Sequence, residues 1–152
     1  MNTSMGGMLG RKGGPFYVER VLASRREARE SLISIKSCLD AFEDGKGSIG
    51  VLRDKYLKIY GIANRVRNDV QLLWRHASCH PKLREEYELI LNEVEQCLHY
   101  LDKFFYILDS DCFRSRIKEL RYCQSSAFGH IDMAYFSLSE VKTLGEPDSG
   151  GN

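Results

Sequence analysis

Apolar residues recur at alternating steps of three and four residues through four parts of the chain. In the first part only Arg25 interrupts the series, and in the second the series is unbroken from Leu52 to Leu73. Because an α-helix has about 3.6 residues per turn, this spacing gathers apolar side chains on one helix face. The first series is Val21, Ala28, Leu32, Ile35, Leu39 and Phe42, and the second is Leu52, Tyr56, Ile59, Ala63, Val66, Val70 and Leu73.

Two further series occupy the second half of the chain. Pro81 suits the first turn of a third helix, because a helix needs no backbone N–H there. Ser110 or Asp111 is suited to cap a fourth helix, whose apolar series contains one polar residue, Gln124. The third series is Tyr87, Leu91, Val94, Leu98, Leu101, Phe105 and Leu108, and the fourth is Ile117, Leu120, Ala127, Ile131, Ala134, Leu138 and Val141.

The four series predict an all-α fold, an antiparallel up-down-up-down four-helix bundle over residues 16–144. Each helix would be roughly 40 Å long at about 1.5 Å per residue. Short connections make consecutive helices antiparallel neighbours. Residues 1–15 and 145–152 are rich in glycine and are predicted to be flexible tails.

Charge supports the pairing of the second and third helices. Residues 49–77 carry an excess of basic residues, and residues 82–109 carry an excess of acidic residues. Opposite charges on neighbouring helices attract through positions that flank the core. The whole chain has a formal net charge of +1, so we expect no nucleic acid partner, and a membrane partner is not favoured.

The cysteines and the termini indicate a cytoplasmic protein. Residues 1–14 lack the apolar core of a signal peptide, and no apolar run is long enough to cross a bilayer. Five cysteines cannot all pair within one chain, so free thiols are expected. Cys97 and Cys123 flank the apolar faces of the third and fourth helices. Filling one core layer without a bond is the favoured interpretation, and a disulfide is the alternative.

Residues 74–83, "WRHASCHPKL", crowd possible metal ligands and catalytic groups against a proline. His76, Cys79 and His80 are three candidate ligands, but a zinc site typically needs four. The next candidate, Cys97, lies roughly 24 Å further along the third helix. We therefore predict no metal site, and a turn between two helices as the simplest interpretation.

The segment "RHASCH" within this stretch resembles the Arg-polar-spacer-His motif of the HEPN ribonucleases, which are helical domains. The resemblance implies Arg75 and His80 as the catalytic pair and His76 as the polar residue. The motif of that family lies within a helix, whereas Pro81 disfavours a helical conformation at His80. No phosphate loop, Cys-x-x-Cys pair or nucleophile elbow is present in the sequence. We predict that the chain is not an enzyme and has no cofactor, with the ribonuclease kept as an alternative.

The fourth helix has aromatic residues where a solvent-facing surface is expected. Tyr122, Gly129 and Phe136 are spaced by seven residues on its outer face, with Phe128 and Tyr135 beside them. Glycine inside an exposed helix costs about 1 kcal/mol relative to alanine, so Gly129 suggests close approach by another backbone. We predict that these five residues bind a protein partner or a second copy. The alternatives are that residues 15–21, "PFYVERV", cover this face, or that the helix register drifts.

A fourth helix that begins "DCFRSRIKEL" is similar to the N-terminal bundles of mixed-lineage kinase domain-like pseudokinases and HeLo-type cell-death domains. Arg116, Ile117 and Leu120 carry this resemblance, over residues 20–142. It implies a signalling module that assembles and acts on membranes. We expect a non-enzymatic interaction domain, an adaptor, scaffold or signalling assembly piece, with a membrane-active cell-death bundle as the other alternative.

Overall fold

The computed structural model describes residues 14–145 and confirms the four-helix bundle. Most of the two predicted tails, residues 1–13 and 146–152, lies outside the described residues. The prediction is wrong at Gly14 and Pro15, which begin α2, and at Gly145, which ends α6. No strand is present between residues 14 and 145. The helices are α2 (Gly14–Ala23), α3 (Arg25–Glu43), α4 (Ile49–His76), α5 (Pro81–Leu108), the short 3-10 helix η2 (Phe113–Arg116) and α6 (Ile117–Gly145).

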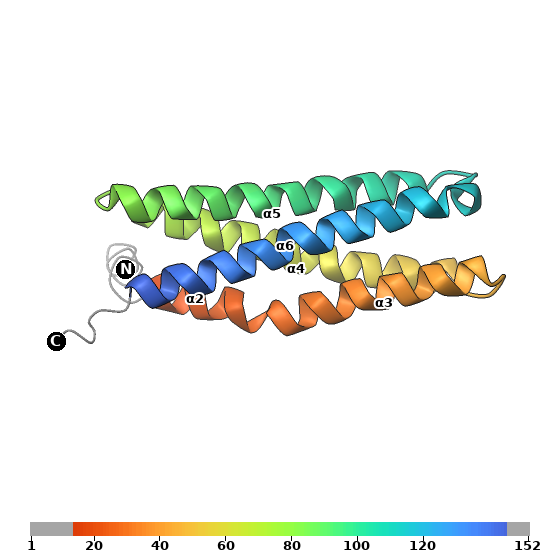
Figure 1. Ribbon diagram of the computed structural model, residues 1–152, viewed down its shortest axis with the longest axis horizontal. Helices are drawn as coiled ribbons and strands as arrows, with labels where there is room; N and C mark the ends of the chain where they lie inside the picture. Colours follow the sequence, from red (N-terminus) through yellow and green to blue (C-terminus); the bar gives the residue numbers. More distant parts are fainter. Residues whose placement is uncertain (1–13, 146–152) are drawn as a thin grey trace, which may run out of the picture.

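Helices α2 and α3 together occupy one of the four positions of the bundle (Figure 1). The four positions form a closed ring, in which α3 packs on α4, α4 on α5, α5 on α6, and α6 on α3. Consecutive helices are antiparallel, so α2 begins and α6 ends at the same end of the bundle (Figure 1). The predicted up-down-up-down order is therefore correct.

The break between α2 and α3 lies at Ser24, one residue before the Arg25 that interrupts the first apolar series. The Ser24 hydroxyl donates to the Val21 carbonyl at 2.7 Å, a local bond that competes with a regular helix. Arg20 also ties α2 to α4, because its guanidinium donates two hydrogen bonds, of 2.7 and 2.9 Å, to the buried carboxylate of Asp69. The chain therefore forms two helices, α2 and α3, in place of one, and the Arg20–Asp69 pair holds α2 against α4.

The apolar series predicted for three of the four bundle positions form the core. Every residue of the first, second and fourth series is buried. The polar Gln124 is buried with the fourth series, and its Nε2 donates to the Leu32 carbonyl of α3 at 2.9 Å. A buried amide with a partner avoids most of the cost of losing water.

The third series is wrong at two positions. Phe105 is 38% exposed, whereas its neighbour Phe104 is completely buried. Likewise Ile90 is buried and Leu91 is only half-buried. Both choices keep the three- and four-residue steps, and both neighbours are apolar, so periodicity alone could not separate them.

The connections at the two ends of the bundle have identifiable causes. Gly45 and Gly47, between α3 and α4, have φ angles of +77° and +107°, which residues with a Cβ rarely adopt. Ser48 then caps α4 by accepting from the Val51 N–H at 3.3 Å. The predicted cap of the fourth helix is wrong, because η2 precedes α6 and the Ser110 hydroxyl donates to the Ile107 carbonyl of α5 instead.

The opposite charges of α4 and α5 make little direct contact. Within residues 14–142, Arg53 and Asp109 form the single ion pair between these charge groups, at 3.4 Å. A larger ionic cluster joins α6 to α3, where Arg121 bonds to both Asp40 and Glu43 at 2.6 Å. Ionic contacts therefore help to fix α6 against α3 more than α4 against α5.

Candidate functional site

The outer face of α6 exposes apolar side chains between Tyr122 and Phe136. Tyr122 is 62% exposed, Phe136 is 52% exposed, and Gly129 lies between them on the surface, as predicted. Met133 is 49% exposed and belongs to the same face, since it follows Gly129 by four residues and precedes Phe136 by three. These four residues, Tyr122, Gly129, Met133 and Phe136, are called the outer strip below. The sequence prediction missed Met133, although this spacing identifies it.

Tyr135 is not part of the surface, which corrects the sequence prediction. Its side chain is completely buried, and its hydroxyl lies 2.8 Å from that of Ser24. Burial raises the pKa of Tyr135 to about 12. The spacing already indicated this position, because Tyr135 follows Ile131 by four residues and precedes Leu138 by three.

Phe128 lies at the edge of the outer strip, on the side that faces α3. It is half-buried, and the guanidinium of Arg29 lies 5.2 Å from its ring centroid. One turn later Asp132 accepts a hydrogen bond from the same Arg29 at 3.0 Å. Phe128 is therefore partly engaged within the bundle and contributes an edge to the predicted surface.

Gly129 sits in the middle of the outer strip with open space around it. A Cβ built on this residue would meet no atom within 4 Å in the described part of the chain. The expected close approach of another backbone is therefore not made by the bundle itself. Residues 15–21 lie within α2 and leave Tyr122 and Phe136 exposed, so the alternative that they cover this face is wrong.

A row of aromatic rings continues the outer strip toward α5. The Tyr100 ring packs edge-on against Tyr122, with centroids 5.8 Å apart, and stacks on His130 at the same distance. A hydrogen bond with Tyr122 raises the pKa of Tyr100. Nδ1 of His130 lies 2.7 Å from a carboxylate oxygen of Glu93, which fixes the ring between α5 and α6. Tyr122 is thus held in place from one side.

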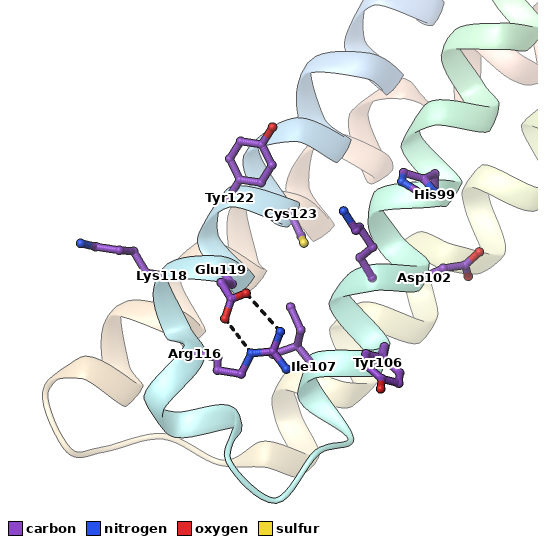
Figure 2. A pocket seen from close by; sticks show the side chains of 10 residues that line it. His99, Asp102, Tyr106, Ile107, Arg116, Lys118, Glu119, Tyr122 and Cys123 are labelled. Carbon is purple, nitrogen blue, oxygen red and sulfur yellow. Dashed lines mark hydrogen bonds and ion pairs between the residues drawn. The ribbon is translucent and has the colours of Figure 1, made fainter.

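A groove of about 760 Å³ opens beside Tyr122, where α5 ends and α6 begins. Its walls carry both charges, including Lys103 and Asp102 from α5. Arg116 and Glu119 pair across two hydrogen bonds, of 2.6 and 3.1 Å, which lowers the pKa of Glu119 (Figure 2).

The stretch "WRHASCHPKL" is a turn, as predicted. Helix α4 ends at His76 and α5 begins at Pro81. Arg75 lies in the last turn of α4 and His80 directly before α5, so this pair does not share one helix as in the HEPN motif. Both side chains are exposed. Trp74 packs on the core and is covered by the guanidinium of Arg84, 3.7 Å from the ring centroid. No group of three His, Cys, Asp or Glu residues is arranged to hold a metal ion in the residues that the structure describes.

All five cysteines are free thiols. Cys97 and Cys123 are both buried, in agreement with the interpretation that they fill the core without a bond. Burial raises the pKa of the Cys97 thiol to about 12 and also raises that of Cys123. Cys79 and Cys112 are exposed and Cys38 is half-buried.

Comparison with known proteins identifies no relative of this chain. No family model matches the sequence, and neither a curated protein nor a solved structure shows significant similarity to it. Within residues 14–145 no helix is long and apolar enough to span a membrane.

Proposed function

We propose that this chain is a non-enzymatic helical domain that binds a protein through the outer strip of α6. The observation that carries the proposal is the separation of two apolar faces on one helix. One face of α6 is fully buried in the core, while Tyr122, Met133 and Phe136 remain exposed on the other. Such a domain would act as a cytoplasmic adaptor, scaffold or signalling assembly unit.

The chemistry of the outer strip supports binding to a protein. Tyrosine, phenylalanine and methionine are enriched at protein interfaces, where their large side chains lose contact with water. Burial of apolar surface contributes about 25 cal/mol per Å². Gly129 adds a low point at the centre of the strip, into which a side chain or a backbone of a partner can fit.

An affinity capture from cell extract with the full chain, read out by mass spectrometry, tests the proposal. Phe136→Asp should abolish the capture of specific partners, because it places an uncompensated charge in the interface. Leu57→Asp is the matched control, since Leu57 is similarly exposed, at 56%, but lies on α4. Equal capture by the wild type and both variants would contradict a partner surface on α6.

A further inference from the structure

The outer face of α6 has a symmetric order about Gly129. Tyr122 and Phe136 lie seven residues before and after it, and Lys118 and Glu140 lie eleven residues before and after it. All four of these side chains are exposed. Aromatic groups therefore flank the glycine on both sides, and opposite charges lie beyond the two ends of the outer strip.

The two terminal charges are not engaged within the bundle. Neither Lys118 nor Glu140 has an ion-pair partner among the described residues, although most other charged residues of α6 do. Figure 2 shows the Lys118 side chain extending from α6 on the side away from α5. Both charges are therefore accessible to a second molecule.

We propose that the outer strip binds a second copy of this chain, with the two α6 helices antiparallel and crossing at Gly129. The proposal rests on the protein-binding function proposed above and names the partner. A two-fold axis through the crossing point makes each contact occur twice. Tyr122 of one copy then faces Phe136 of the other, and Lys118 of one copy faces Glu140 of the other.

Charge selects the antiparallel arrangement. In a parallel pair crossing at Gly129, each Lys118 would face another Lys118, and each Glu140 another Glu140. Like charges at an interface are unfavourable, whereas the antiparallel pair has two attractive contacts instead. The sequence of α6 is therefore self-complementary in one direction only.

The spacing of the strip fixes the crossing geometry. A repeat of seven residues matches helices that cross at about 20° and keep contact over several turns. Glycine at the crossing point removes the side chain that would hold the two backbones apart, and nothing in the bundle fills the space beside Gly129. The intrinsic cost of a glycine within a helix is thereby given a structural reason.

The size of the strip predicts a weak dimer. Lys118 and Glu140 lie about 33 Å apart along the helix, and a contact about 12 Å wide over this length covers on the order of 400 Å² per copy. Stable complexes bury about 1,200 Å² or more in total. Dissociation is therefore expected in the micromolar range, on the order of 10 μM or weaker.

Sedimentation velocity on the full chain, from about 5 to 500 μM at low ionic strength, measures the dimer directly. Lys118→Glu alone and Glu140→Lys alone should each weaken association about tenfold, because both symmetric contacts become repulsive. The double variant carrying both changes restores attraction and should return to the affinity of the wild type. Gly129→Arg should abolish association, and Leu57→Asp should leave it unchanged.

Three results would overturn the inference. The first is a monomer at every concentration, and the second is a dimer that Gly129→Arg leaves intact. The third is a failure of the double charge variant to restore what the single variants lose, which would exclude the antiparallel register. None of these three results contradicts the proposed function, because the capture experiment tests that function separately. Loss of specific partners with Phe136→Asp but not with Leu57→Asp would keep the proposed function, with a different protein as partner.

Discussion

The hydroxyl groups of Ser24 and Tyr135 lie 2.8 Å apart and join the break between α2 and α3 to the middle of α6. Tyr135 is completely buried, so its hydroxyl has no access to water. A buried hydroxyl without a partner would destabilise the fold by about 1 to 3 kcal/mol. The helix break therefore also provides the partner that lets a tyrosine occupy the core.

Tyr135→Phe should destabilise the protein by about 1 kcal/mol. The ring still fills the core, and the Ser24 hydroxyl retains its bond to the Val21 carbonyl, so only one hydrogen bond is lost. Urea unfolding followed by circular dichroism measures the difference. Tyr106→Phe is the control, because Tyr106 is 75% exposed, and its effect should be below about 0.5 kcal/mol.

Gly129→Ala should stabilise the monomer by about 0.5 to 1 kcal/mol. Its backbone does not have a positive φ, and a Cβ would meet nothing within 4 Å. Gly45→Ala should have the opposite effect, since Gly45 has a φ of +77°. Thermal unfolding at low protein concentration compares the two variants. A loss of stability in Gly129→Ala would mean that this part of α6 is not a regular exposed helix.

Phe136→Asp should leave folding nearly intact, with a change of about 0.5 kcal/mol or less, because Phe136 is half exposed. Leu98→Asp should unfold the bundle, because Leu98 is 5% exposed and an unpaired carboxylate in the core is very unfavourable. Far-ultraviolet circular dichroism and thermal unfolding distinguish the two. If the two variants unfold alike, the outer strip is part of the core and cannot be a binding surface.

The periodicity of the sequence was sufficient for the bundle, because every residue of the first, second and fourth apolar series is buried. It failed on α5, where Ile90 and Leu91, and again Phe104 and Phe105, are adjacent apolar pairs. Which member of each pair is buried depends on how α5 is rotated between α4 and α6. That rotation is a property of the packed bundle and is not encoded in the helical repeat of one segment.

The outer strip could be predicted in part from the helical spacing of its residues. Tyr122, Gly129 and Phe136 repeat every seven residues and lie opposite the buried series. Tyr135 was placed on this surface because it is adjacent to Phe136, although its spacing from Ile131 and Leu138 indicated the core. The partner of its hydroxyl, Ser24, is distant in sequence. The break at Ser24 had no proline or glycine to indicate it. Long-range polar contacts of this kind cannot be read from local spacing.

Arg121→Gln should destabilise the protein at neutral pH and make its stability less dependent on pH in acid. The hydrogen bond from Arg121 holds the pKa of Asp40 below its ordinary value of 3.8. This contact contributes stability above about pH 4 that is lost as the pH falls through the lowered pKa. Unfolding free energies at neutral pH and at about pH 2 should therefore differ less in the variant than in the wild type. An equal difference in both proteins would contradict an ionic role for Arg121.

Cys79 and Cys112 should react with iodoacetamide in the folded protein at about pH 8, and Cys97 should not. The first two thiols are exposed, whereas Cys97 is completely buried, with its pKa raised to about 12. Mass spectrometry of digested protein identifies the labelled residues. In guanidinium chloride all five cysteines should react, which shows that burial protects Cys97. Rapid labelling of Cys97 under native conditions would contradict its place in the core.

The hydrogen bond from Gln124 to the Leu32 carbonyl makes one alignment of α6 along α3 distinct from all others. After a shift of α6 by one helical turn, apolar side chains could still pack against α3, because different aliphatic side chains fill similar space. A shifted α6 would move the amide of Gln124 away from its acceptor while keeping it inside the protein, at a cost of about 1 to 3 kcal/mol. A single polar residue thus excludes misaligned bundles that the apolar series alone would permit.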